Sequence, residues 1–155
     1  MKFSVVIAAW NESAQIFSSL KRLRQISQSS PMELIVVDGG SDDGTAELAR
    51  EWADHVLVHE EPNRGKQLDA GARIASGDLL FFLRPDAQPP GNWQQALEHF
   101  WLTAHTQKIS ATVFSVDYGA ALSLRMASRM ANASVDWRGV ASGEHGLCTT
   151  PEIYR

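Results

Sequence analysis

Apolar stretches of strand length alternate with stretches of helical period along most of the chain. Most of the apolar stretches are nearly continuous, as expected for strands covered on both faces of a sheet. We therefore expect strands at residues 3–9, 34–37, 55–59, 79–83 and 111–116. Between and after them we expect helices at residues 12–27, 45–52, 65–75, 92–105 and 120–132.

This alternation predicts a single α/β domain, residues 1–155, with an open and mainly parallel sheet. Right-handed crossovers then place helices on both faces of the sheet. After Asn132 the pattern weakens, so the segments 136–139 and 142–146 are expected to be loop or site material. The small residues 70–72 are expected to let their helix pack closely.

The composition is that of a globular protein, with 44% hydrophobic and 21% charged residues. A net charge of -4 argues against a nucleic-acid partner and against wholesale binding to anionic lipid. The longest apolar runs have six residues, too short to span a bilayer, and no signal peptide precedes the first strand. Cys148, the one cysteine, cannot form an internal disulfide. Together these features predict a soluble cytoplasmic protein.

Polar side chains follow three of the expected strands at their carboxyl ends. Asn11 and Glu12 follow the first strand and Asp38 follows the second. Arg84 and Asp86 follow the fourth. Because doubly wound sheets bind ligands at the carboxyl ends of their strands, we expect these side chains to converge on one ligand.

Each of these residues also has a purely structural interpretation. Asn11 or Ser13 could only cap the helix that follows, and Asp42 and Asp43 could only favour the start of the next helix. Asp86 could be a turn carboxylate instead of a ligand for a hard metal ion on a diphosphate.

For Asp38 we favour a ligand role over a turn role. It comes directly after an apolar strand, and the glycines that follow, Gly39 and Gly40, let a backbone approach a ligand closely. Arg64, Gly65 and Lys66 open an expected helix, where two cations and a helix N-terminus suit a phosphate. Alternatively, Arg64 and Lys66 are solvated charges on the protein surface.

Several familiar catalytic motifs are absent from the sequence. It contains no GxxxxGK[ST] loop, no GxGxxG after the first strand and no HExxH. Cys148 lies near His145, but no orienting partner accompanies them, so we do not expect a thiol nucleophile.

Four segments, taken in order, resemble the family 2 glycosyltransferases, which have a GT-A fold. The segments are residues 4–12, 33–45, 63–72 and 75–87. The resemblance covers residues 3–91 closely and the remainder more loosely. It implies a donor-binding half at residues 1–91 and a partial acceptor half at residues 92–155.

The resemblance implies a nucleotide-diphosphate sugar as donor. Asp86 would be the last residue of the family's DXD motif and would ligate a divalent cation, Mn²⁺ or Mg²⁺. The motif usually begins with Asp, whereas Arg84 cannot ligate a metal, so either Arg84 assists the diphosphate directly or metal dependence is weaker. The residues expected to bind the nucleotide sugar are Ala9, Asn11, Glu12, Asp38, Ser41, Arg64, Gly65, Lys66 and Arg84.

The resemblance also implies an inverting displacement at the anomeric carbon. Basic groups and the metal stabilise the leaving diphosphate, while a carboxylate removes the proton of the acceptor hydroxyl. The residues from 143 onwards resemble the segment before the family's catalytic acidic pair, so we expect the base beyond Arg155 and the fold to be truncated at its C-terminus. Glu144 is the nearest candidate for the base inside the chain, and we assign it to acceptor binding. The acceptor could be lipid-linked, with peripheral membrane contact.

Two alternatives accompany this hypothesis. A nucleotide-sugar binding module without transferase activity would account for a missing base. A nucleotidyltransferase would need a Gly-rich phosphate loop with Arg or Lys directly after the first strand. The sequence has Ala8–Glu12 there, which disfavours this second alternative.

Overall fold

The alternation of apolar strands and helices forms one layered α/β structure. The computed structural model describes residues 1–103, 111–115, 117, 119, 121–138 and 146–154. The strands are β1 (Phe3–Ala9), β2 (Met32–Asp38), β3 (His55–Val58), β4 (Leu79–Leu83), β5 (Thr112–Val113) and β6 (Leu147–Thr149). The helices are α1 (Ile16–Ile26), α2 (Thr45–Arg50), α3 (Arg64–Ile74), α4 (Trp93–Thr103), α5 (Leu122–Arg138) and α6 (Pro151–Tyr154).

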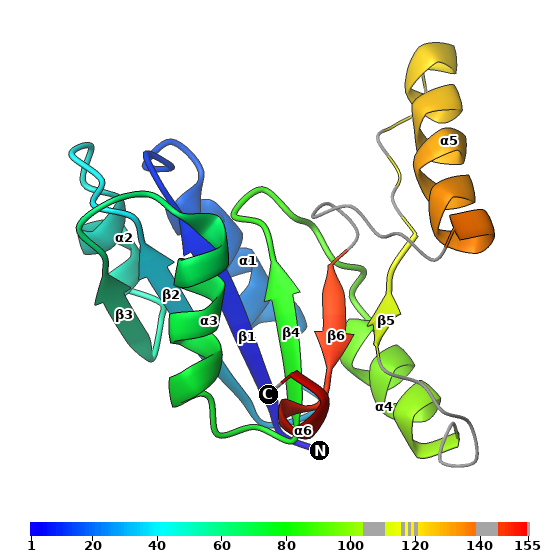
Figure 1. The fold of residues 1–155 in the computed structure, drawn as a ribbon, viewed down its shortest axis with the longest axis horizontal. Helices are drawn as coiled ribbons and strands as arrows, with labels where there is room; N and C mark the ends of the chain where they lie inside the picture. The colour runs from blue at the N-terminus through cyan, green and yellow to red at the C-terminus, as the bar shows by residue number, and fades with distance from the viewer. Residues whose placement is uncertain (104–110, 116, 118, 120, 139–145, 155) are drawn as a thin grey trace.

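The strands of the described residues form one sheet in the order β3-β2-β1-β4-β6-β5 (Figure 1). β1 pairs in parallel with both β2 and β4, and β2 pairs in parallel with β3. β6 is antiparallel to β4, and β5 is antiparallel to β6. The predicted mainly parallel sheet is therefore confirmed, with an antiparallel edge that the sequence did not indicate.

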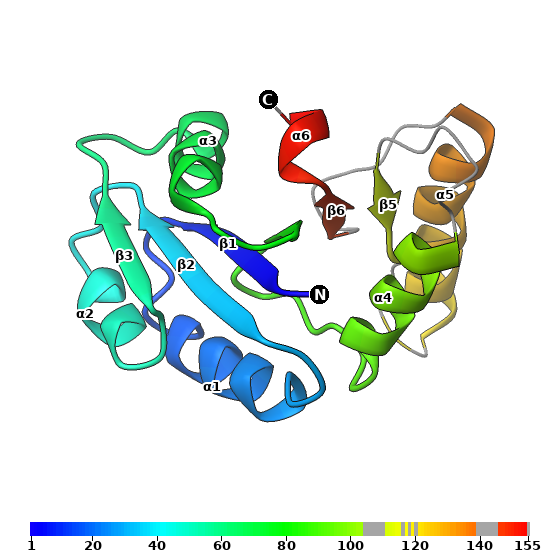
Figure 2. The same cartoon turned by 90° about the horizontal axis from the view of Figure 1, so that it is seen from below.

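Helices cover both faces of the sheet, as predicted, because successive strand residues point to opposite faces. Val5 and Ile7 of β1 face the cluster that contains α1, α2 and α4, whereas Val6 faces the cluster that contains α3. Figure 2 shows α1 and α2 on one side of the sheet and α3 and α6 on the other. All three side chains are at most 2% exposed, so both faces are sealed from water.

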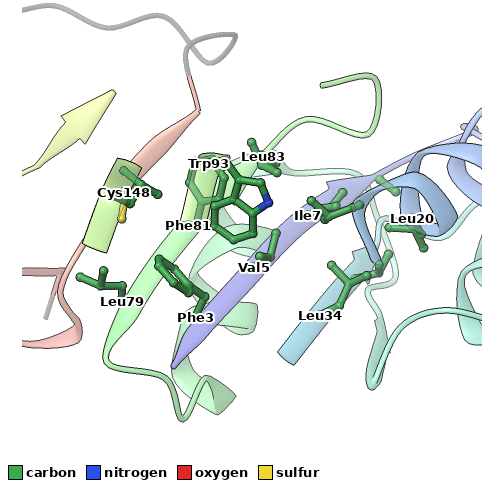
Figure 3. Packing of buried hydrophobic residues seen from close by; sticks show 14 of the residues in the cluster. Phe3, Val5, Ile7, Leu20, Leu34, Leu79, Phe81, Leu83, Trp93 and Cys148 are labelled. Carbon is green, nitrogen blue, oxygen red and sulfur yellow. The ribbon is translucent and has the colours of Figure 1, made fainter. Parts of the chain in front are cut away.

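Trp93 of α4 is the centre of the larger cluster (Figure 3). Its ring stacks on Phe81 at 5.0 Å between centroids and meets Phe3 edge to face at 4.9 Å. Its indole N–H donates to the hydroxyl of Ser27 at 2.9 Å, so this fully buried aromatic residue leaves no polar atom unpaired.

Close packing of α3 on the sheet depends on Gly71. A Cβ atom at this position would lie 2.4 Å from Cγ1 of Val6 and 3.2 Å from Cγ2 of Val37. The helix backbone therefore lies directly on β1 and β2, as the small residues of this helix predicted.

The structure departs from the predicted elements after residue 110. β5 is much shorter than expected, and β6 was not predicted because three residues show no period. α5 continues to Arg138, so the expectation of a loop at residues 136–138 is wrong. The helix can continue this far because no glycine occurs between Gly119 and Gly139. Glu144 and its neighbours from 139 to 145 lie outside the described residues. Among the described residues, no helix is both long and apolar enough to cross a bilayer.

Candidate functional site

The loops that follow β1 and β2 are fastened to each other at the carboxyl edge of the sheet. The backbone N–H of Asn11 donates to the hydroxyl of Ser41 at 2.9 Å. The N–H of Glu12 donates to the hydroxyl of Thr45 at 2.8 Å. Asn11 has a left-handed backbone, with a φ of 53°, which asparagine adopts more readily than most residues. The two loops consequently hold one another in a single arrangement.

Helix α1 begins later than the sequence predicted. Its cap position is Gln15, so the interpretation of Asn11 or Ser13 as its cap is wrong. The side-chain oxygen of Asn11 instead accepts from the N–H of Asp42 at 3.3 Å. The carboxylate of Glu12 accepts a hydrogen bond from the amide of Gln15. Both side chains thus serve the local loop structure.

Asp43 joins the two loops and also opens α2. One carboxylate oxygen accepts from the N–H and the hydroxyl of Thr45, at 3.0 and 2.5 Å. The other oxygen accepts from the N–H of Ser13 at 2.9 Å. These hydrogen bonds, led by the one from the Thr45 hydroxyl, hold the pKa of Asp43 well below its usual range. The predicted role at the start of α2 is confirmed.

Asp38, at the end of β2, is only 1% exposed. Its carboxylate accepts from the N–H of Gly40 at 3.1 Å and from the N–H and hydroxyl of Ser41, at 2.8 and 2.5 Å. The side chain therefore organises the turn that follows it, which was the alternative interpretation. Its contact with a ligand stays a prediction.

Gln67 is a site residue that sequence reasoning missed. Only 3% exposed, it donates its amide hydrogens to the carbonyl oxygens of Ala9 at 2.9 Å and Val37 at 2.8 Å. A Cβ atom on Gly39 would lie 2.9 Å from Cα of Pro62 and 3.1 Å from Nε2 of Gln67. The absence of a side chain on Gly39 thus leaves room for the residues that lead into α3. From the sequence, this room was expected to serve a ligand.

Arg84 and Asp86 form an ion pair just after β4 ends, and the charge of Arg64, the first residue of α3, acts on both. Arg84 donates two parallel hydrogen bonds to Asp86, from Nε to Oδ1 at 2.8 Å and from Nη2 to Oδ2 at 3.0 Å. The Arg84 hydrogen bond lowers the pKa of Asp86, and the nearby charges of Arg84 and Arg64 act in the same direction. The three side chains together carry one net positive charge.

Arg64 is the first residue of α3, whose cap residue, Asn63, accepts from the N–H of Lys66 at 3.0 Å. Arg64 is exposed, yet partial desolvation and repulsion from Arg84 lower the pKa of its guanidinium. An arginine so perturbed stays protonated at neutral pH. The N-terminus of α3 and the charges of Arg64 and Arg84 therefore make this region positive, which suits an anion.

The other two residues predicted at this helix start have looser surroundings. The ammonium of Lys66 lies 3.6 Å from the carboxylate of Glu61, and both side chains are well exposed. A Cβ atom on Gly65 would meet only the Asn63 side chain, at 3.6 Å, so no close approach requires glycine here. Their contact with a nucleotide sugar stays a prediction.

A cleft of about 860 Å³ opens beside the Arg84–Asp86 pair. Its wall includes Phe114 and Asp117 from the segment after β5, Arg22 from α1 and the turn at Pro89. The size is within the range of small-molecule sites. Sequence reasoning missed Phe114, Asp117 and Arg22, because they are brought to the end of β4 only by the packing of the antiparallel edge and α1.

The residues at this corner fit a divalent cation only in part. Among the described residues, no group of three or more His, Cys, Asp or Glu side chains could hold a metal ion. Asp86 offers hard oxygen atoms of the kind that Mg²⁺ and Mn²⁺ prefer, but Arg84 engages both of them. The site therefore fits a divalent cation only where a bound diphosphate contributes further oxygen ligands.

Cys148 lies in β6 and is completely buried. Burial raises the pKa of its thiol to about 12. A thiol that stays protonated in the core is not a nucleophile. The burial of Cys148 agrees with the expectation that it is not a nucleophile.

Two curated proteins resemble this chain in sequence. Glycosyltransferase AglE of Haloferax volcanii is 33% identical over 97 residues, which cover 58% of this chain and 32% of that protein. The undecaprenyl-phosphate 4-deoxy-4-formamido-L-arabinose transferase of Aeromonas hydrophila is 36% identical over 98 residues, which cover 56% and 29%. The chain therefore matches about a third of the length of these relatives.

Comparison with solved structures identifies the fold. The mannosyltransferase PcManGT from Pyrobaculum calidifontis, in complex with GDP-Man and Mn²⁺, superposes with a TM-score of 0.71 at 20% identity. The match covers 97% of this chain and 44% of that one, and it confirms the predicted GT-A fold. The model of glycosyl transferase family 2 matches residues 4–130. This chain belongs to glycosyl transferase family 2.

Proposed function

We propose that this chain binds a nucleotide-diphosphate sugar and takes part in transferring the sugar to an acceptor hydroxyl. The observation that carries the proposal is the Arg84–Asp86 ion pair at the end of β4, together with the charge of Arg64 from the first turn of α3. A diphosphate is the part of such a donor that needs positive charge and N–H donors. PcManGT, which shares the fold, was solved with GDP-Man.

The nucleoside would lie along the interlocked loops of β1 and β2. Asp38 is fully engaged with its own turn, so it acts by fixing the backbone at residues 40–41. The exposed surface of these loops is then available to the base and ribose. The residues proposed for this part of the site are Ala9, Asn11, Glu12, Asp38 and Ser41.

The reaction would proceed by direct displacement with inversion. The acceptor oxygen forms a bond to the anomeric carbon, the bond from that carbon to the diphosphate breaks, and the electron pair leaves with the diphosphate. Arg64 and Arg84 stabilise the negative charge that develops there. A carboxylate on the acceptor side takes the hydroxyl proton, and we place that base outside the described residues.

A divalent cation, Mn²⁺ or Mg²⁺, would assist through Asp86. When bound, it supplies Lewis-acid neutralisation of the diphosphate. PcManGT was solved with Mn²⁺. In this chain the diphosphate must provide most of the ligands, since Asp86 is shared with Arg84.

The cleft beside Asp86 would receive the acceptor. Its wall combines apolar surface at Phe81, Phe114 and Pro89 with the cation of Arg22. Such a wall suits a molecule with an apolar body and an anionic group. The Aeromonas hydrophila relative is named for undecaprenyl phosphate, which has both parts, and we propose a lipid-linked acceptor on this basis.

Calorimetric titration with UDP and GDP, each with and without Mn²⁺, tests donor binding. We expect saturable binding of at least one nucleoside diphosphate, and no binding under any of the four conditions would contradict the proposal. Transfer or slow hydrolysis of the matching sugar nucleotide would establish the enzyme. Binding with neither reaction would favour a nucleotide-sugar binding module.

A further inference from the structure

The ion pair between Arg84 and Asp86 is arranged so that a ligand can replace Asp86 as the partner of Arg84. Both side chains are about two-fifths exposed, at 41% and 45%, so solvent and ligands reach them. Because both side chains are exposed, water and salt weaken the attraction between them. A diphosphate presents the same forked oxygen geometry to a guanidinium and carries more charge than one carboxylate. A diphosphate can therefore replace Asp86 as the partner of this guanidinium.

The sign of the local charge depends on this arginine. Arg64 and Arg84 against Asp86 give one net positive charge. An aspartate in place of Arg84 would give one net negative charge. The difference of two units equals the charge of one Mg²⁺ or Mn²⁺ ion, and it falls at the end of β4 where the diphosphate is proposed to bind.

The other nearby cations are engaged elsewhere. The ammonium of Lys66 lies beside Glu61, and the guanidinium of Arg22 donates to the carbonyl of Pro89 at 3.3 Å. Partial desolvation and, after it, repulsion from the charge of Arg84 lower the pKa of Arg64. Among the described residues, Arg64 and Arg84 are thus the pair whose charges act together on Asp86.

We infer that Arg84 supplies the diphosphate with much of the positive charge that a divalent cation would otherwise bring. On binding, its guanidinium turns from the Asp86 carboxylate to the diphosphate oxygens. The donor is then held without a metal ion, and a metal ion adds a smaller contribution through the released carboxylate. This inference rests on the proposed function and specifies the metal requirement of the same site.

Binding of UDP and GDP to the intact chain, measured in EDTA and in Mn²⁺, tests the inference directly. For the wild-type chain we expect dissociation constants that differ by less than about tenfold between the two conditions. For Arg84→Asp we expect binding in EDTA to weaken at least about 100-fold, because attraction becomes repulsion, and Mn²⁺ to restore most of it.

Two further variants make the result specific. Arg84→Gln removes the charge without reversing it and should give an intermediate metal dependence. Arg73→Gln breaks a comparable pair, Nε of Arg73 to Asp69 at 2.8 Å, near the other end of α3, and should bind like the wild type. Circular dichroism confirms that each variant is folded.

The possible outcomes separate the inference from the proposed function. Wild-type binding that requires Mn²⁺, or metal-free binding that survives in Arg84→Asp, overturns the inference and leaves the proposed function in place. Absence of binding even with Mn²⁺ overturns both.

Discussion

The side-chain amide of Gln67 donates a 2.9 Å hydrogen bond to the carbonyl oxygen of Ala9, across the space between α3 and the end of β1. The same nitrogen donates to Val37 of β2 at 2.8 Å. One buried side chain therefore ties the helix that begins with Arg64 to both strands that carry the proposed nucleoside site. We therefore expect these hydrogen bonds to help position the first turn of α3 against the strand ends.

Replacing Gln67 should affect both stability and binding. In Gln67→Met the two carbonyls lose a buried donor, and we expect the free energy of unfolding to fall by about 2 kcal/mol. Because α3 is then less firmly placed, binding of the nucleoside diphosphate should also weaken. Urea unfolding and calorimetric titration measure the two effects.

Gln94 provides the matched control, since it is equally buried but lies away from the site. It accepts from the N–H of Ser29 at 3.1 Å and donates to the carbonyl of Ser30 at 2.9 Å. Gln94→Met should lose similar stability and keep wild-type affinity. Equal loss of affinity in both variants would show that Gln67 has no particular bearing on the site.

The close approach of α3 to the sheet makes Gly71 sensitive to the smallest addition. In Gly71→Ala the new methyl group would lie 2.4 Å from a methyl of Val6, so helix or strand must shift. We expect a loss of about 2 kcal/mol in the free energy of unfolding.

Gly65→Ala on the same helix meets no comparable contact and is the control. It should be neutral or stabilising by up to about 1 kcal/mol, because alanine is the better helix former. Denaturant unfolding of both variants provides the comparison. Similar effects at the two positions would contradict the packing account.

Glu33 stabilises the opposite, amino-terminal edge of the sheet. Burial would raise its pKa, but hydrogen bonds from Ser4, from the N–H and hydroxyl of Ser76 and from Lys2 outweigh burial and lower the pKa to about 2. A carboxyl whose pKa is lower when folded stabilises the fold above its unfolded pKa. That stabilisation, about 3 kcal/mol, is lost as pH falls from about 4.5 through about 2.

Glu33→Gln should therefore be less stable than the wild type at pH 7 and approach it near pH 2. Urea unfolding at several pH values measures the gap. Glu47→Gln, at an exposed position on α2, is the control variant. A gap between wild type and Glu33→Gln that stays constant with pH would contradict the assigned pKa.

The sequence predicted the parts of this fold that depend on local pattern. Strands buried on both faces are continuous apolar runs, so they could be recognised. Parallel topology places the polar residues that follow them at one edge of the sheet, so Arg84 and Asp86 could be located there. Gln67 could not, because its partner Ala9 is 58 residues away and neither residue has a local signal. Asp38 was interpreted as a ligand-binding residue because its hydrogen-bond partners in the turn form only when the turn folds, and the sequence does not reveal them.

The antiparallel edge was the least predictable region. β6 has only three residues and pairs with β4, more than sixty residues earlier in the chain. Its position is determined by packing of Cys148 in the core, which no period in the sequence reveals. The cleft residues Phe114 and Asp117 were missed for the same reason.

Mapping of nucleoside-diphosphate binding by two-dimensional ¹H–¹⁵N NMR, with Mg²⁺ present, tests the central claim most directly. A 17.1 kDa chain is well suited to this measurement. We predict shifts in the amide signals of residues 9–12, 38–45, 63–67, 84 and 86, with α5 unaffected. Shifts confined to other parts of the chain, or no shifts with either UDP or GDP, would contradict it.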